Sequence, residues 1–265
     1  LSVTSLRITW SDSNGAVSGR KGFVIVAMDS TVLGDTVFAA AGLGTVTRSD
    51  TLSGYTPNFK DTLKVKMIDS LGTVVYSDSV MGFTLASPPY RLTHSGIQML
   101  QWTTTITADS NAGTPMYSIY DSTSHLWINS SGLSVSDTTW QTKVAWGNKA
   151  VLSKLKSKQY LVTALARNGD SIVTAFAPMD TVNTLPSTPY NLASSKIADT
   201  TKIRITWSDS NWTPADSFWI ASGADSTQLY SATTDTTGAD TATGLIYNQR
   251  LWYRIAKRDS LQTTV

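Results

Sequence analysis

The chain has 265 residues, and its 21 basic residues nearly balance its 19 acidic residues, all of which are Asp. It contains neither Glu nor Cys, whereas Ser and Thr together contribute 73 residues. Because Glu favours helices and Ser, Thr and Asp favour turns, caps or strands, this composition argues against a helical protein. The missing residue types also exclude disulfides, zinc–cysteine sites, thiol nucleophiles and paired-Glu catalysis.

Charge and hydropathy narrow the classes of partner. A net charge of +2 with 15% charged residues is too dilute for an electrostatic nucleic-acid binder, so we expect no nucleic acid. No apolar run approaches the roughly 18 residues of a membrane-spanning helix, and we therefore expect no membrane span. A chain rich in Ser, Thr and Asp with little charge is typical of a secreted, β-rich structural protein. We expect an extracellular or cell-surface location in a bacterium.

The first strong pattern is an eight-residue segment that occurs twice. Arg7–Asn14 and Arg204–Asn211 both read RITWSDSN, and Asp69–Val75 is similar to Asp259–Val265. The copies of each pair lie almost 200 residues apart, about twice the length of a small β-sandwich. Such a period indicates an internal repeat and predicts a middle copy between the two.

A middle copy is present. Leu100–Trp102 matches the Trp-containing strand, and Asp170–Val173 matches the later hairpin. Ser87–Leu92 and Ser187–Leu192 resemble each other, and both contain Pro, which cannot donate a hydrogen bond to a sheet. We therefore expect three modules, at 1–86, 87–185 and 186–265.

Apolar and polar residues alternate within the modules, which predicts half-buried antiparallel strands. Asn168-Gly169 predicts a tight hairpin turn. No segment favours a helix of ten or more residues. The predicted fold class is all-β, with three tandem antiparallel β-sandwiches. The alternating apolar residues are Leu6, Ile8 and Trp10, then Leu63, Val65 and Met67, then Ile203, Ile205 and Trp207, and finally Tyr253 and Ile255.

These features together resemble the fibronectin type III family. The resemblance rests on the Pro before each later module (Pro88, Pro89, Pro189), the Trp of the second strand (Trp10, Trp102, Trp207) and a late strand that contains Tyr (Tyr160, Tyr253). It implies immunoglobulin-like sandwiches that act as spacers. One departure is Asp61, which stands where the family places the late Tyr.

The outer modules look incomplete. Only nine residues precede Trp10, whereas Pro189 lies eighteen residues before Trp207. We expect the first module to lack most of strand A and the third to be truncated in strand G. Two interpretations remain open: the chain is a window from a longer tandem array, or neighbouring molecules donate the missing strands.

An Asp-Ser-Asn tripeptide follows each Trp strand, at Asp12, Asp109 and Asp209. Alternating oxygens of this kind can begin a calcium loop. No further carboxylate follows at suitable spacing, so we favour an Asx-turn, in which the side chain caps its own backbone. We expect no metal and no cofactor.

Aromatic residues are the strongest binding candidates. Exposed Trp rings stack on sugars, and Trp127, Trp140, Trp146 and Trp212 are the candidate glycan-binding residues. The competing interpretation is that these rings fill sandwich cores and contacts between modules. Asn129 and Asn211 lie in glycosylation sequons.

No catalytic motif surrounds the two histidines, His94 and His125, and no Ser lies in a nucleophile elbow, so we predict no catalytic residue. A lysine cluster is compatible with a patch that binds nucleic acid or an anionic polysaccharide, but Lys at a strand edge also blocks aggregation, which we favour. The cluster consists of Lys149, Lys154, Lys156 and Lys158.

The sequence thus predicts a non-enzymatic extracellular structural protein, a tandem array that acts as a spacer or as a self-associating surface or fibre component. Its expected partners are copies of itself or neighbouring modules of the same chain. The alternative is a glycan-binding or accessory module of a secreted polysaccharide-degrading enzyme or adhesin, with polysaccharide as the partner.

Overall fold

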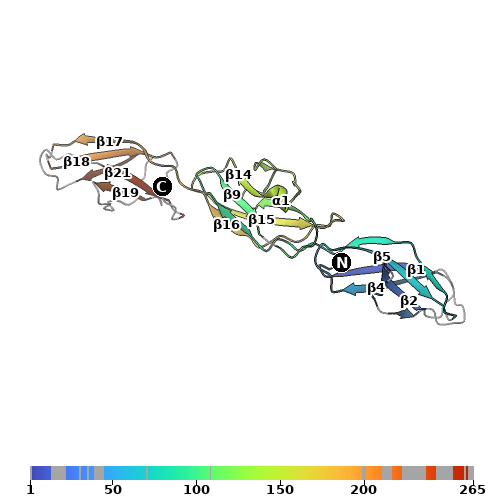
Figure 1. Cartoon of the computed structure of the whole chain (residues 1–265). Coiled ribbons are helices and arrows are strands. Elements are labelled where there is room, and N and C mark those ends of the chain that lie inside the picture. The colour runs from blue at the N-terminus through green and yellow to red at the C-terminus, as the bar shows by residue number, and fades with distance from the viewer. Residues whose placement is uncertain are drawn as a thin grey trace.

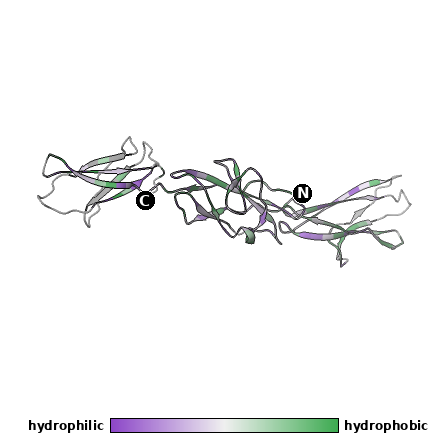
Figure 2. Cartoon of the chain, turned by 90° about the horizontal axis from the view of Figure 1, so that it is seen from above, coloured by the Kyte–Doolittle hydropathy of each residue, from purple (hydrophilic) through white to green (hydrophobic). Residues whose placement is uncertain are grey.

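The protein forms three β units that follow one another along an extended chain (Figure 1). The structure is a computed structural model that describes residues 2–12, 22–29, 31–34, 36–38, 45–69, 71–107, 109–198, 201–210, 217–222, 237–242, 253–259 and 261. We name the units N-terminal (β1–β7), middle (β8–β16) and C-terminal (β17–β21). Seen from above, they keep the same end-to-end order (Figure 2). The only helix within these ranges is α1 (Lys143–Trp146), and none is long enough to cross a membrane.

The N-terminal unit has two antiparallel sheets. β1 (Ser5–Asp12) pairs with β4 (Val46–Ser53). The second sheet has the order β3-β2-β5-β6, and β7 also pairs with β5. Its strands are β2 (Gly22–Ala27), β3 (Val37–Phe38), β5 (Lys60–Ile68), β6 (Val74–Tyr76) and β7 (Val80–Phe83). Leu6, Ile25, Leu52 and Leu63 form the buried core between the sheets, with Trp10 packed against it.

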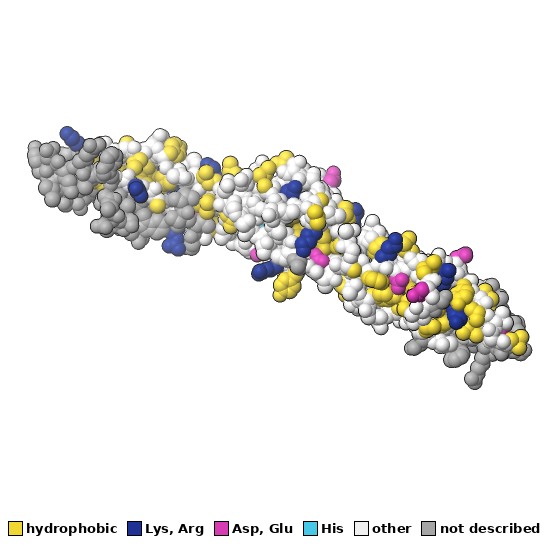
Figure 3. All heavy atoms as spheres, in the orientation of Figure 1, with side chains coloured by type: hydrophobic (Ala, Val, Ile, Leu, Met, Phe, Trp, Pro, Cys, Tyr) yellow, Lys and Arg dark blue, Asp and Glu magenta, His cyan; other side chains and the backbone are white. Residues whose placement is uncertain are grey.

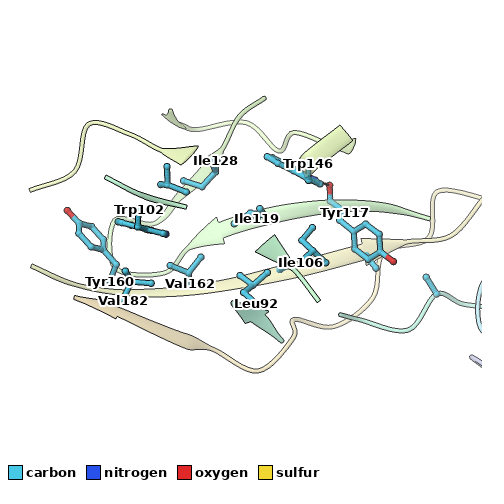
Figure 4. Packing of buried hydrophobic residues seen from close by; sticks show 14 residues of the cluster. Leu92, Trp102, Ile106, Tyr117, Ile119, Ile128, Trp146, Tyr160, Val162 and Val182 are labelled. Atoms are coloured by element: carbon cyan, nitrogen blue, oxygen red, sulfur yellow. Dashed lines mark hydrogen bonds between the residues drawn. The ribbon is translucent and has the colours of Figure 1, made fainter. Parts of the chain in front are cut away.

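The middle unit has the most extensive core. One sheet has the order β14-β9-β8, and the other has the order β12-β11-β10-β15-β16, with β13 also on β10. This order agrees with an immunoglobulin-like sandwich. Buried aromatic and aliphatic side chains from both sheets meet between them (Figure 4). The strands are β8 (Leu92–Ser95), β9 (Trp102–Ile106), β10 (Met116–Asp121), β11 (Leu126–Ile128), β12 (Ser134–Val135), β13 (Gln141–Thr142), β14 (Asn148–Val151), β15 (Gln159–Arg167) and β16 (Asp180–Asn183).

The C-terminal unit repeats the plan with fewer described strands. β17 (Tyr190–Lys196), β18 (Ile203–Ser208) and β20 (Thr237–Ala242) form one sheet, with β18 in the centre. β19 (Ser217–Ser222) pairs with β21 (Tyr253–Arg258). Ile205, Trp207 and Phe218 form its core.

The predicted all-β fold is confirmed, and so is the alternation that predicted it. Leu6 is buried and Arg7 is exposed on β1, and Ile205 is buried and Arg204 is exposed on β18. The central strands β9 and β18 each have a partner on both edges, whereas β1 pairs only with β4 among the described residues.

The predicted hairpin at Asn168-Gly169 is confirmed by the antiparallel bridge between Arg167 and Val173, but its turn is longer than two residues. Asn168 closes this longer turn by donating its N–H to the Ile172 carbonyl at 3.1 Å. The Asn168 side chain accounts for the difference, because its Oδ1 accepts from the N–H groups of both Asp170 and Ile172. The positive φ falls on Ser171 (63°) rather than on Gly169.

Candidate functional sites: unit junctions, buried ion pairs and an aromatic face

A tyrosine corner stands at the start of β15. The Tyr160 hydroxyl accepts a hydrogen bond from the Leu155 N–H at 2.8 Å, and its ring packs against Trp102. Burial raises the pKa of Tyr160. In the N-terminal unit Asp61 takes the corresponding place, and Tyr55 donates its hydroxyl proton to Asp61 at 2.7 Å. Desolvation and this carboxylate raise the pKa of Tyr55. The N-terminal unit therefore has a comparable corner, in which the strand residue Asp61 is the acceptor and the Tyr comes from the preceding loop.

The last strands of the N-terminal and middle units end in the same way. The Thr84 hydroxyl accepts from the Phe59 N–H and donates to the Thr56 carbonyl. The Thr184 hydroxyl accepts from the Lys158 N–H and donates to the Leu155 carbonyl, next to the tyrosine corner. Both linkers therefore leave their units from an anchored position next to the corner.

The junction between the N-terminal and middle units contains two buried asparagines. Asn58 Nδ2 donates to the Ala112 carbonyl at 2.8 Å, and Asn58 Oδ1 accepts from the Gly169 N–H at 3.1 Å. From the other side, Asn168 Nδ2 donates to the Thr84 carbonyl at 3.1 Å. Asn58 and Asn168 are only 4% and 3% exposed, so both side chains are shielded from water. Asn58 also has a φ of 53°, a conformation that Asn tolerates better than most residues.

Further contacts close the same junction. The Ala112 N–H donates to the Pro57 carbonyl at 2.7 Å, and the Phe83 N–H donates to Asp170 Oδ2 at 3.2 Å. Gly169 lies against the Phe83 ring so closely that a Cβ there would come within 2.3 Å of the ring. The junction thus combines backbone, side-chain and ring contacts from both units, and it leaves no room for a side chain at Gly169.

The Asp-Ser-Asn tripeptide of the middle unit forms the predicted Asx-turn, since the Asn111 N–H donates to Asp109 Oδ1 at 2.9 Å. Asn111 then holds the linker: its Oδ1 accepts from the Ser87 N–H at 2.6 Å, and its Nδ2 donates to the Ser87 carbonyl at 2.8 Å. The Tyr117 hydroxyl donates to the Asp109 carboxylate. The turn therefore fixes the chain as it enters the middle unit.

The other two tripeptides place their aspartates in buried ion pairs. Asp12 accepts from Arg48 at 3.5 Å in the N-terminal unit, and Asp209 accepts from the Lys257 ammonium in the C-terminal unit. Asp209 also accepts from the Ser187 hydroxyl, which again ties the linker to this turn. Residues 13, 14 and 211 of these tripeptides lie outside the described residues. No group of three or more His or Asp that could hold a metal occurs in the described part of the chain.

Among the described residues, fewer hydrogen bonds connect the middle and C-terminal units than connect the N-terminal and middle units. Lys156 Nζ donates to the Ser210 hydroxyl at 3.1 Å, and Ser210 donates to the Ser187 hydroxyl at 2.9 Å. Lys156 was predicted to be part of a surface cluster, and it instead connects the middle unit to the C-terminal unit.

The predicted lysine cluster is not one patch. Lys154 is buried and donates to Asp121 and to the Ser134 hydroxyl, both at 2.7 Å, so its prediction as an edge lysine is wrong. Lys149 reaches the Ser130 carbonyl, and Lys158 is exposed. On the face shown in Figure 3, the basic side chains are spread along the chain.

Of the predicted glycan-binding residues, Trp127 lies in an aromatic cluster with Tyr120 and Phe176. The ring centroids of Trp127 and Tyr120 are 4.7 Å apart, and the Trp127 and Phe176 rings are 6.3 Å apart and nearly parallel. Phe176 is 48% exposed, and Trp127 and Tyr120 are half-buried. We call these three residues the aromatic face. Trp140 is not part of it and lies under the Arg167 guanidinium, 4.7 Å from the ring centroid.

Trp146 is a core residue. It is 2% exposed, and its Nε1–H donates to the Tyr117 carbonyl at 2.8 Å, so its ring offers no face to a sugar. Trp212 and the sequon at Asn211 lie outside the described residues. At the other sequon, Asn129 is half-buried, and its Oδ1 accepts from the Ser131 and Leu133 N–H groups.

The histidines take separate positions. His94 Nδ1 lies 3.1 Å from the Thr104 hydroxyl, and its Nε2 lies 3.7 Å from Asp180. Desolvation lowers the pKa of His94, although Asp180 opposes this. His125 sits in a turn beside Tyr120, with its Nδ1 3.4 Å from the hydroxyl.

Sequence reasoning missed the junction residues Asn58 and Asn168. Asn168 stood in the predicted hairpin turn Asn168-Gly169, where Asn is common for local reasons. The partners of Asn58 and Asn168 lie 54 and 84 positions away in the sequence, so no local pattern indicates these contacts.

Comparisons with known proteins gave matches to solved structures only. Neither a protein-family model nor a curated protein matches the sequence. A crystal structure of the FN1-FN3 domains of chicken CNTN1 aligns with 97% of this chain and 89% of that chain, at 13% identity and a TM-score of 0.29. A central fibronectin-III array of RIM-binding protein aligns with 81% of this chain and 78% of that chain, at 14% identity and a TM-score of 0.26.

Proposed function

We propose that the chain is a non-enzymatic spacer segment of an extracellular bacterial structural protein, built from three fibronectin type III-like modules at 1–86, 87–185 and 186–265. The observation that supports this most strongly is the first junction, where Asn58 and Asn168 exchange hydrogen bonds with the opposite unit. Domains joined by a flexible tether need no buried hydrogen bonds between them. Directional hydrogen bonds between units are expected where the angle between those units must stay fixed.

The junction limits bending because its contacts are directional. A change in the angle between the units would separate the Asn58 side chain from Ala112 and Gly169, and each buried group left unpaired costs about 1–3 kcal/mol. Two of the Asp-Ser-Asn tripeptides add a second restraint, since Asn111 fixes Ser87 at the first linker and Asp209 accepts from Ser187 at the second. Force applied along the chain would therefore pass through anchored linkers.

Stiffness can be measured with spin labels, and the absence of native Cys makes the labelling specific. We would introduce Cys at the exposed positions Thr51 and Ser136, one in each unit, and measure the label distance by pulsed electron resonance. A narrow distribution that broadens in the double variant Asn58→Gly, Asn168→Ala is expected. A parent distribution as broad as that of the variant would contradict the rigid-spacer proposal.

Self-association is part of the proposal, and β1 is the strand that supports it. β1 has one described partner, whereas β18, with the same RITWS sequence, has two. An open strand edge is a template for pairing with another chain. Sedimentation of the full chain at rising concentration, with hydrogen exchange of β1 amides, tests this. A monomer at all concentrations, with unchanged β1 exchange, would remove self-association from the proposal.

The aromatic face supports a second candidate function, the binding of polysaccharide. Tyr120, Trp127 and Phe176 bring three rings together on the middle unit, and sugar rings stack on such surfaces. A glycan array should show binding that is lost in Trp127→Ala and in Phe176→Ala. Tyr90→Ala is the matched control, because Tyr90 is exposed but lies outside the cluster. No binding in the parent, or equal loss in the control, would reject this function.

A further inference from the structure

We propose that Lys154 and Asp121 condense to an intramolecular amide bond that cross-links the middle unit. Asp121 is the last residue of β10, and Lys154 lies between β14 and β15, so the bond would join segments 33 residues apart in sequence. The proposal does not depend on the spacer function, although a cross-link suits a chain that bears load.

The nucleophile and the carboxyl group are already in contact. Lys154 Nζ lies 2.7 Å from Asp121 Oδ2, and the Lys154 and Asp121 side chains are 4% and 0% exposed. Nζ also lies 2.7 Å from the Ser134 hydroxyl, which holds the amine against the carboxyl group. Groups fixed in this way react with effective concentrations of about 10⁵ M or more, far above that of the water that would hydrolyse the product.

The carboxyl group is arranged as an electrophile. While Oδ2 faces the amine, Oδ1 accepts from the Thr123 N–H at 3.0 Å and from the Ser124 N–H at 3.2 Å. Two backbone donors on one oxygen stabilise the negative charge that develops there during attack on Cγ. The two N–H groups can therefore act as an oxyanion hole for Oδ1, while Oδ2, next to the amine, can leave as water.

The surroundings are aromatic and buried. Nζ lies 5.6 Å from the Trp102 ring centroid and 5.1 Å from that of Tyr160, and these rings pack against each other in the core (Figure 4). Burial also raises the pKa of the Tyr160 hydroxyl. A buried ion pair is costly to maintain, whereas a neutral amide in the same place removes both charges.

The reaction needs no further reactant. Transfer of one proton from the ammonium to the carboxylate gives an amine and a carboxylic acid. Nζ then attacks Cγ, the electron pair moves to Oδ1, and collapse of this intermediate expels Oδ2. The oxygen leaves as water with its own proton and a second proton from Nζ. One C–N bond forms, one C–O bond breaks, and nothing is oxidised or reduced.

Intact-mass spectrometry of the full chain tests the proposal directly. The measured mass should be about 18 Da below the sequence mass, the loss of one water. After trypsin treatment, peptide 92–143 should be found joined to peptide 150–156, because the modified Lys154 is no longer cleaved. A mass equal to the sequence mass would overturn the proposal, as would a loss of water that maps to Lys257 and Asp209 instead.

Variants provide the matched comparison. Lys154→Arg keeps the positive charge but removes the amine, and Asp121→Ala removes the carboxyl group, so both should have their full sequence mass. Lys158→Arg changes an exposed lysine nearby and should keep the loss of water. Cross-linked peptides that persist in Lys154→Arg would contradict the assignment. Because the parent mass decides the question, a variant that fails to fold does not weaken the test.

Discussion

Replacing Asn58 with Gly should loosen the first junction without disturbing the backbone. Asn58 has a φ of 53°, which Gly adopts freely, so the change removes the side chain and adds no strain. It deletes the hydrogen bonds to Ala112 and from Gly169 and leaves two partly buried backbone groups without these partners. Each unsatisfied group costs about 1–3 kcal/mol, and water entering the gap relieves part of this cost. We therefore expect the free energy of opening the junction to fall by about 2 kcal/mol.

The Gly169 amide is the reporter for this loss, since its N–H donates to Asn58 Oδ1. If opening of the junction exposes this amide, 2 kcal/mol corresponds to roughly 30-fold faster hydrogen exchange, measured by NMR on the full chain. Core amides of β15 should keep their parent rates. Asn58→Asp keeps the acceptor for Gly169 but turns a carboxylate oxygen toward the Ala112 carbonyl oxygen, so it should also loosen the junction. Unchanged Gly169 exchange in Asn58→Gly would refute the assigned role.

Three further outcomes are expected. Gly132→Ala should destabilise the middle unit by about 3 kcal/mol or more, because the φ of Gly132 is +81° and a Cβ would lie 1.8 Å from the Ala150 oxygen. Gly54→Ala is the control, since Gly54 has a φ of +89° but open space around it, and it should cost clearly less in the same melting experiment. Tyr160→Phe should lower stability by about 1–2 kcal/mol in urea titrations monitored on the middle unit, since the corner amide loses its acceptor. The lowered pKa of His94 means that the unfolded chain binds more protons as pH falls below about 6.5. Stability should therefore fall from pH 7 to pH 5 in the parent and less in His94→Gln, whereas parallel melting profiles would contradict this.

The fold was predictable because its signals are local. Alternation along β1 and β18 places Trp10 and Trp207 on the core side, and a period-2 pattern needs only neighbouring residues to be read. The Asx-turn at Asp109 was predictable for the same reason, since the side chain caps a backbone group two residues away.

The sites were harder to predict because their partners are distant in sequence. Asn58 accepts from a residue 111 positions later, and Lys154 meets Asp121 across 33 positions. Composition placed Lys154 among surface lysines, because an isolated lysine is rarely buried. Lys154 is buried because it pairs with the Asp121 carboxylate at the end of β10, and no local pattern indicates such a partner. Trp146 failed as a glycan candidate in the same way, since its burial depends on how β10 packs beneath it.

The repeated Asp-Ser-Asn tripeptide shows what duplication preserved and what it left free to change. Each aspartate accepts a hydrogen bond within its unit, yet the donor is Arg48, the Tyr117 hydroxyl or Lys257. The three donors come from different strands, so the requirement concerns the carboxylate rather than a particular partner. A buried carboxylate without a donor would carry a large desolvation cost, and any nearby cation or hydroxyl relieves it. In the middle and C-terminal units the tripeptide also holds the Ser of the preceding linker, Ser87 through Asn111 and Ser187 through Asp209, so both linkers enter their units at a fixed position.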